Sequence, residues 1–204
     1  MAQLELTFAV IAIMIKATDG GPVLYKQVRL TKGRKEFEIY KFRTMIQDAE
    51  KLTGARLASE NDDRILPVGK FLRATRLDEL PQLINILKGE MSIVGPRPER
   101  PELAEKIEKE LPEFAYRLKV KAGLTGYAQI YGKYNTTSYD KLKLDLTYIR
   151  NYSLLLDFKL MLMTPKIMLM KESTEGVGAQ EKLLEQQELA AARMDIHFDE
   201  GENS

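Results

Sequence analysis

Residues 73–98 read RATRLDELPQLINILKGEMSIVGPRP, and this stretch decides how the rest of the chain is interpreted. Two arginines, Arg73 and Arg76, stand just before two adjacent carboxylates, Asp78 and Glu79. A proline and an apolar run follow, and the stretch closes on a glycine, two prolines and a third arginine. The order of these residues predicts a helix that starts at the carboxylates and continues through the apolar run.

The helix is predicted to begin near Asp78 and to run to about Lys88. Aspartate at a helix start accepts backbone N–H bonds, and proline, here Pro81, is tolerated only in the first turn. Helix N-termini bind phosphate, and neighbouring arginines add charge-assisted hydrogen bonds. A carboxylate placed there can attack a phosphorus whose charge the arginines and a metal ion screen. In a second interpretation Asp78 only caps the helix and the arginines pair with acids, and the spacing alone does not exclude it.

The stretch resembles the signature of the bacterial sugar transferases, the monotopic phosphoglycosyl transferases that begin capsule, exopolysaccharide and O-antigen synthesis. The residues that carry the resemblance here are Asp78-Glu79-Leu80-Pro81-Gln82-Leu83, Asn85, Gly89 and Met91-Ser92-Ile93-Val94-Gly95-Pro96-Arg97-Pro98. Further motifs follow the family's order at residues 21–23, 25–27, 40–45 and 123–126, with Gln129 after them. The resemblance covers residues 10–172, and several long motifs in one order make it specific.

The resemblance implies a phosphoglycosyl transferase that moves a sugar 1-phosphate from a UDP-sugar to undecaprenyl (polyprenol) phosphate and releases UMP. It implies that Asp78 forms an aspartyl-phosphosugar intermediate and that Glu79 assists the movement of protons and charge. Mg²⁺ is the expected cofactor, with Asp78 as its ligand, because a divalent cation neutralises a diphosphate. Residues 131–137 are similar to the exopolysaccharide branch, but the sequence leaves the identity of the sugar open.

The resemblance implies that Lys41, Arg43 and Gln129 lie near the substrate, and Arg73 and Arg97 are expected to bind it with them. Guanidinium groups bind phosphate with two parallel hydrogen bonds, which a lysine cannot copy. Arg97 lies between two prolines, which restrict the backbone and hold the side chain in place. Each residue also has a structural reading: a charged strand end for Lys41 and Arg43, a loop stabiliser for Arg97, and a solvated loop side chain for Gln129.

The amino-acid composition limits which side chains can act as nucleophile or general base. The chain has 204 residues, 44% of them hydrophobic, which suits one domain. It has no cysteine, so a thiol nucleophile is excluded. Its single histidine, His197, lies in an acidic tail, so a general base is expected to be Glu, Asp or Lys.

Acidic and basic residues are unevenly distributed along the chain. Residues 175–204 hold eight acidic and two basic residues, whereas residues 1–174 hold 22 acidic and 29 basic ones. A basic body suits an anionic substrate or an anionic membrane surface. No basic, aromatic-interleaved patch indicates a nucleic-acid partner. Residues 173–204 are expected to form an acidic, flexible tail, and a homo-oligomer remains open.

Two apolar segments point to a membrane. Residues 1–15 are too short to cross a bilayer, which needs about 20 apolar residues. In the resembling family this region is the second half of a re-entrant helix, so residues 1–16 are expected to form a partial membrane helix. Residues 153–170 are rich in Leu and Met, and Asp157, Lys159 and Lys166 argue against a spanning helix. Together with the resemblance, this pattern favours an interfacial helix. A buried helix is the alternative for both. The expected location is the cytoplasmic face of the bacterial cell membrane.

The predicted fold class is α+β: helices around a small antiparallel β-hairpin, with re-entrant or interfacial membrane helices. The hairpin is expected from strands at 23–30 and 36–42 with a turn at 31–34. Helices are expected at 100–119, broken at Pro112, and at 141–152. Residues 17–172 form the predicted catalytic domain. No dinucleotide fingerprint or P-loop occurs. The rival function is a non-catalytic lipid- or partner-binding module on the same fold, against which the intact Asp78-Glu79 pair argues.

Overall fold

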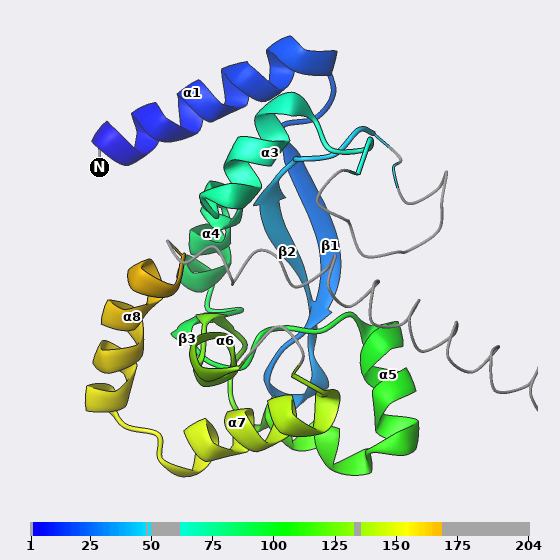
Figure 1. Cartoon of the computed structure of the whole chain (residues 1–204), viewed down its shortest axis with the longest axis vertical. Helices are drawn as coiled ribbons and strands as arrows, with labels where there is room; N and C mark the ends of the chain where they lie inside the picture. Colours follow the sequence, from blue (N-terminus) through cyan, green and yellow to red (C-terminus); the bar gives the residue numbers. More distant parts are fainter. Residues whose placement is uncertain (1, 48, 50–61, 133–135, 169–204) are drawn as a thin grey trace, which may run out of the picture.

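The computed structural model describes residues 2–47, 49, 62–132 and 136–168, and these residues form an α+β fold (Figure 1). The elements run in the order α1 (Ala2–Asp19), β1 (Leu24–Leu30), η1 (Lys32–Arg34), β2 (Glu36–Phe42), α3 (Pro67–Ala74), η2 (Leu77–Glu79), α4 (Gln82–Leu87), β3 (Ser92–Val94), α5 (Pro101–Glu110), η3 (Pro112–Lys119), β4 (Gly123–Thr125), α6 (Tyr127–Tyr131), α7 (Ser138–Arg150) and α8 (Leu154–Met168), where η denotes a 3₁₀ helix. The predicted fold class is confirmed in its α+β part. The acidic tail lies outside the described residues.

The predicted β-hairpin is present. Strands β1 and β2 pair antiparallel from Leu24 opposite Phe42 to Leu30 opposite Glu36. The turn η1 holds Gly33 at φ 69°, a conformation that glycine adopts at little cost. Phe37, Ile39 and Phe42 of β2 are buried, and Phe37 and Ile39 pack with Met91 and Ala122. The hairpin forms the centre of the fold, with α3 and α4 on one side of it and α5 on the other (Figure 1).

Helix α1 is buried on one face and exposed on another. Ile11 and Ile15 pack with Phe42 of β2 and Leu72 of α3 in one hydrophobic cluster. Other apolar residues of α1 face away, with Leu6 66% and Ile13 68% exposed. The alternative of a buried N-terminal helix therefore describes only half of its surface.

A second, parallel strand pair was not expected. Strands β3 and β4 pair in parallel, with Ser92 opposite Gly123 and Val94 opposite Thr125. The backbones approach so closely that a Cβ on Gly123 would lie 2.1 Å from the Gly95 nitrogen. Likewise, a Cβ on Gly126 would lie 2.1 Å from the Gly95 oxygen. Two of the motif glycines thus serve close backbone packing.

The helix predicted at 78–88 is broken into two pieces. The 3₁₀ helix η2 covers Leu77–Glu79 and the α-helix α4 covers Gln82–Leu87. Pro81 explains the break, because it has no N–H and its ring crowds the carbonyl four residues earlier. That carbonyl, of Leu77, accepts the Leu80 N–H instead, at 3.2 Å. Asp78 makes no cap hydrogen bond, so the expectation that Asp78 starts the helix was wrong.

Helices α7 and α8 complete the fold around Tyr148 and Leu160, which are buried with Val94 and Ile130. The predicted break at Pro112 is confirmed, since α5 ends at Glu110 and η3 begins at Pro112. Helix α8 contains Pro165 and keeps much of its apolar surface exposed. Among the described residues, no helix combines the length and the apolar character that crossing a bilayer requires.

Candidate functional site

Glu79 joins two cations from distant parts of the chain. Its Oε1 accepts hydrogen bonds from Lys41 Nζ at 2.9 Å and from Arg97 Nη2 at 2.8 Å. Lys41 lies at the end of β2, Glu79 in η2, and Arg97 in the loop after β3. Three of the predicted site residues are therefore brought together, although 38 positions separate Lys41 from Glu79 in the sequence.

The two cations decide the charge state of Glu79. Burial raises the pKa of Glu79, but Arg97 and Lys41 outweigh burial and hold that pKa well below its usual range. Glu79 in turn raises the pKa of Arg97. Burial lowers the pKa of Lys41, against the pull of Glu79. Glu79 is therefore a carboxylate at neutral pH, and its charge holds both cations in place.

Asp78, the neighbouring carboxylate, is not bound by a cation of the described chain, and its pKa is shifted in the opposite direction from that of Glu79. It has no hydrogen-bond partner among the described residues, and it is partly exposed. Burial raises the pKa of Asp78, and Glu79 adds to the rise, whereas Lys41, Arg73 and Arg76 oppose it. Asp78 is thus an unpaired carboxylate surrounded by cations, which leaves its oxygens free to bind or attack.

The backbone before Asp78 is held in an unusual conformation. Arg76 has φ 58° and ψ 15°, in the left-handed region that residues with a side chain rarely occupy. This turn separates α3, which ends in Arg73 and Ala74, from η2. Such a residue costs about 1 kcal/mol or more, and it persists because the surrounding structure fixes it. It directs the chain so that Asp78 and Glu79 follow directly on a helix that carries Arg73.

Asn85 connects the helix after the carboxylates to the hairpin. Its Nδ2 donates to the Glu38 carbonyl at 2.7 Å, and its Oδ1 accepts the Tyr40 N–H at 3.0 Å. The side chain thereby replaces a third strand at the edge of β2. Asn85 was one of the residues that carry the family resemblance but had no predicted role of its own, although an amide inside an apolar run is a signal for a buried structural polar group.

For two other predicted substrate residues, Arg43 and Gln129, the hydrogen bonds in the described chain are made with groups other than Glu79. Arg43 pairs with Asp19 at the end of α1 and donates from Nε to the Pro22 carbonyl at 2.6 Å. Its guanidinium is buried and fixes the junction between α1 and the hairpin. Gln129 donates to the Leu124 carbonyl at 3.2 Å, while its buried Oε1 has no hydrogen-bond partner in the described chain.

A divalent cation fits this site only as a group shared with a substrate. Within the described ranges, no three His, Cys, Asp or Glu side chains gather as a metal cluster. Glu79 is already bound by Lys41 and Arg97. At this site, Asp78 is the one carboxylate of the described chain that is not already bound. Mg²⁺ is commonly held by one or two carboxylates plus substrate phosphates and waters, so the donor set suits it.

Lysine and arginine side chains beside an unpaired carboxylate are the groups that a phosphorylated ligand would need. Comparison with known proteins identifies the protein family. The sequence profile of the family described as bacterial sugar transferase matches residues 1–171, and the chain belongs to this family.

Several relatives are closely similar. A UDP-N-acetylgalactosamine-undecaprenyl-phosphate N-acetylgalactosaminephosphotransferase of Aeromonas hydrophila is 42% identical over 161 residues, covering 78% of this chain and 38% of the relative. A UDP-glucose:undecaprenyl-phosphate glucose-1-phosphate transferase of Klebsiella pneumoniae is 42% identical, covering 76% of this chain and 34% of the relative. A Bacillus subtilis protein, a putative undecaprenyl-phosphate N-acetylgalactosaminyl 1-phosphate transferase, is 52% identical over 110 residues, covering 54% and 61%. The chain thus spans less than two thirds of the length of each of these relatives.

Proposed function

We propose that this chain transfers a sugar 1-phosphate from a UDP-sugar to undecaprenyl phosphate and releases UMP. The observation that carries the proposal is the pair of adjacent carboxylates in opposite states, with Glu79 bound by two cations and Asp78 unpaired. The names of the relatives support the reaction, since each describes an undecaprenyl-phosphate sugar transferase. Their sugars differ, so the proposal covers the reaction and leaves the sugar open.

The first half of the reaction is proposed to occur at Asp78. One carboxylate oxygen attacks the phosphorus that bears the sugar, the bond from that phosphorus to the oxygen bridging to UMP breaks, and UMP leaves. In the second half, a phosphate oxygen of undecaprenyl phosphate attacks the same phosphorus and frees Asp78. Two displacements at one phosphorus regenerate the carboxylate and need no further reactant.

The surrounding cations are proposed to bind the diphosphate. Arg73 lies in the last turn of α3 and is partly exposed, and Arg97 keeps 35% of its side chain exposed while bound to Glu79, so both can reach an anion. Lys41 is bound to Glu79 and adds positive charge beside Asp78. Such fixed charges stabilise the negative charge that develops as the phosphoryl group transfers. Arg43 contributes from further away, by holding α1 against the hairpin.

Mg²⁺, when bound, would neutralise the diphosphate and polarise its phosphorus. Among the described residues, Asp78 would hold the cation. Glu79 keeps its role with or without the cation, because its charge positions Lys41 and Arg97.

Trapping of the covalent intermediate tests the proposal. With a radiolabelled UDP-sugar and no acceptor, the wild-type protein is expected to retain label and to release UMP. Asp78→Asn should retain none, and Asp63→Asn, which alters an exposed aspartate elsewhere, should label as the wild type does. Equal labelling of Asp78→Asn and the wild type would contradict the assignment. Absence of label and of UMP release in every protein would instead favour the rival, a non-catalytic lipid- or partner-binding module.

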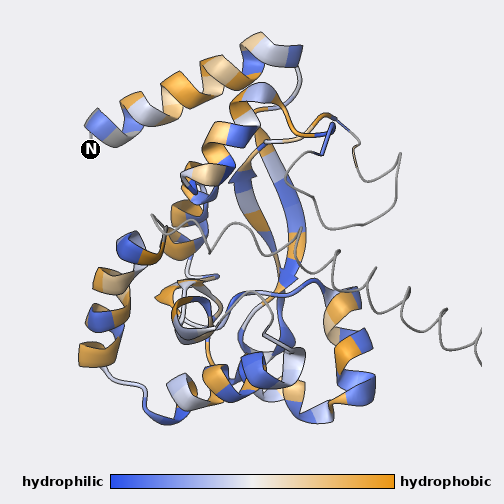
Figure 2. Cartoon of the chain, viewed as in Figure 1, coloured by the Kyte–Doolittle hydropathy of each residue, from blue (hydrophilic) through white to orange (hydrophobic). Residues whose placement is uncertain are grey.

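We also propose that α1 and α8 seat the protein on the cytoplasmic face of the membrane, where the tail of the acceptor resides. Both helices expose apolar side chains, and both are rich in hydrophobic residues, which are coloured orange in Figure 2. On α8, Leu155 is 81% and Leu162 80% exposed. Lys159 and Lys166, also exposed on α8, suit anionic headgroups. Burying a leucine side chain contributes about 1.5–3 kcal/mol, which makes an interfacial helix favourable.

Flotation with liposomes that contain anionic lipid tests the membrane proposal. Leu155→Glu with Leu162→Glu should weaken binding about tenfold or more, since two buried leucines are lost. Leu103→Glu with Tyr116→Glu is the matched control, because these exposed residues lie on α5 and η3. It adds the same charge and should float almost as the wild type does. Equal flotation of both double variants would show that α8 does not contact lipid.

A further inference from the structure

The loop that carries Arg97 has no free carbonyl over four successive residues. Pro96 accepts from Gly123 N at 2.9 Å, and Glu99 accepts from Leu30 N at 3.0 Å. Between them, the Arg97 carbonyl accepts from Arg117 Nη2 at 2.8 Å, and the Pro98 carbonyl accepts from Arg29 Nη1 at 3.2 Å. Two of these residues are prolines, which have no N–H to donate, so the loop is fixed through its carbonyls.

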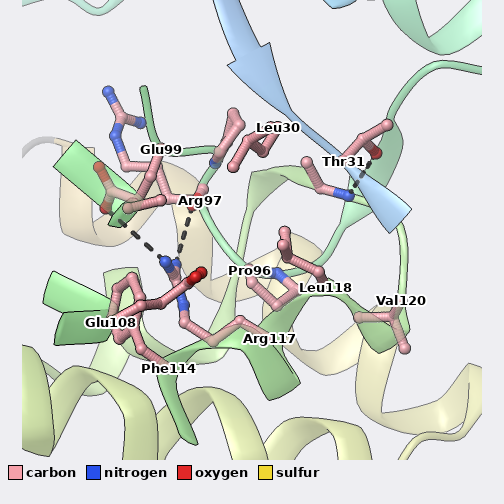
Figure 3. A pocket seen from close by; sticks show the side chains of 13 residues that line it. Leu30, Thr31, Pro96, Arg97, Glu99, Glu108, Phe114, Arg117, Leu118 and Val120 are labelled. Carbon is pink, nitrogen blue, oxygen red and sulfur yellow. Dashed lines mark hydrogen bonds and ion pairs between the residues drawn. The ribbon is translucent and has the colours of Figure 1, made fainter. Parts of the chain in front are cut away.

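Arg117 stands at the centre of this arrangement. Its side chain is 4% exposed, and its Nε donates to Asp145 Oδ2 at 2.5 Å. Its Nη1 lies 3.8 Å from Glu99 Oε1, a carboxylate that also binds Lys141. In Figure 3 the Arg117 guanidinium lies beneath the loop, with dashed lines to Arg97 and Glu99. One planar group thereby connects η3, α7 and the Arg97 loop.

We propose that Arg117 is a positioning residue for the transfer reaction, acting through the Arg97 backbone. This inference rests on the proposed function. Asp145 fixes the plane of the guanidinium by binding Nε, so Nη2 can donate only where the Arg97 carbonyl lies. The Arg97 side chain leaves the same residue in the direction of Glu79. The position of the Arg97 guanidinium beside Asp78 therefore depends on a side chain that touches neither carboxylate of the site.

The effect is expected in catalysis more than in folding. A displacement of about 1 Å in a group that orients the reacting atoms can cost about a hundredfold in rate. Lysine in place of Arg117 keeps the charge but cannot donate to Asp145 and to the Arg97 carbonyl with one planar group. Arg117→Lys should thus lower kcat more than it raises KM, and kcat/KM should fall about tenfold or more.

A double-mutant cycle separates positioning from general damage. Arg97→Lys alone is expected to lower kcat/KM about tenfold or more, since a lysine cannot make the bidentate contact. If Arg117 acts through Arg97, adding Arg117→Lys to Arg97→Lys should cost less than about twofold more, because residues in one network are non-additive. Additive losses would overturn the proposal. Asp145→Asn keeps the Arg117 guanidinium, so its loss of kcat/KM should be smaller, and that loss should also be non-additive with Arg97→Lys. This variant replaces Arg117→Lys in the cycle if Arg117→Lys does not fold.

A second readout does not depend on activity. In protein labelled with ¹⁵N-arginine, the Arg97 Nε signal, assigned by its loss in Arg97→Lys, should shift in Arg117→Lys and in Asp145→Asn. It should not shift in Arg64→Lys, which breaks a different buried pair, that of Arg64 with Asp62. An unchanged Arg97 signal in both Arg117→Lys and Asp145→Asn would overturn the proposal. Failure of the wild type to release UMP would overturn the proposed function alone and leave this measurement valid.

Discussion

Two charged clusters lie on either side of the loop that carries Arg97, and they differ in what they leave unpaired. The site cluster consists of Lys41, Arg73, Arg76, Asp78, Glu79 and Arg97. The support cluster consists of Arg29, Glu99, Arg117, Lys141 and Asp145. Both contain two carboxylates and an arginine that binds one of them at a short distance. In the support cluster each carboxylate has an ion-pair partner, whereas in the site cluster Asp78 has none among the described residues.

The difference separates a scaffold from a reactive site. Arg117 and Asp145 are almost inaccessible, with side chains 4% and 1% exposed. Burial of that degree with paired charges fixes geometry but admits no substrate. In the site cluster the Arg97 side chain is 35% exposed, and Asp78 is partly exposed. A surplus of positive charge that is accessible to solvent suits an incoming diphosphate.

The largest effect is expected from Glu79→Gln, which removes the charge shared by Lys41 and Arg97. Breaking a buried ion pair from one side costs about 3–5 kcal/mol, and the exposure of Arg97 reduces this to about 2–4 kcal/mol. Asp78→Asn should leave the free energy of unfolding unchanged or raise it slightly, because burial disfavours the Asp78 charge. Denaturant unfolding at pH 7 measures both.

The same experiment compares the two clusters directly. Asp145→Asn in the support cluster should also destabilise the fold, since it removes the charge that binds Arg117. If Asp78→Asn destabilised the protein as much as Glu79→Gln does, the two carboxylates would be equivalent structural groups. The distinction between a bound and a free carboxylate would then be wrong.

The hairpin follows from local sequence, and the two candidate carboxylates were identified by the family resemblance. Alternation of buried residues in β2 is a short-range pattern, so Phe37 and Ile39 were predictable. Asp78 and Glu79 are adjacent, so their association needed no folding information. Their opposite charge environments could not be predicted, because Lys41 and Arg97 come from positions 38 residues before and 18 residues after Glu79.

Long-range pairing also explains what the sequence did not indicate. Arg117 and Asp145 are 28 residues apart on separate helices, and each resembles a solvated charge on an amphipathic segment. The parallel pairing of β3 and β4 joins two three-residue strands, too short for a periodic pattern. Arg43 was expected near the substrate, and only the folded chain places its partner Asp19 beside it.

The two carboxylates should also respond to pH in opposite ways. Lys41 and Arg97 hold the pKa of Glu79 below its usual value of 4.5, so its contribution to stability is present above pH 4.5 and is lost as pH falls below it. Burial raises the pKa of Asp78 above its usual value of 3.8, so ionising Asp78 costs the folded state stability as pH rises through that range. The loss of folding stability at low pH should therefore reflect Glu79. The decrease of kcat/KM at low pH should reflect Asp78.

The smallest expected effect is a shift of the pH profile of kcat/KM. If the Asp78 carboxylate is the nucleophile, kcat/KM should decrease as the pH is lowered and Asp78 becomes protonated. Because the pKa of Asp78 is raised, this decrease should begin at a pH above 3.8. Arg73 lowers the pKa of Asp78, so Arg73→Gln should move this fall to higher pH, in addition to weakening substrate binding. Profiles of kcat/KM normalised to their maxima separate the two effects. Lys106→Gln, on the exposed face of α5, removes the same charge elsewhere and should leave the profile in place. Loss of a nearby cation can only make the Asp78 carboxylate harder to form. If Arg73→Gln left the acid-side decrease of kcat/KM at the same pH, or moved it to lower pH, a group other than Asp78 would therefore be titrating.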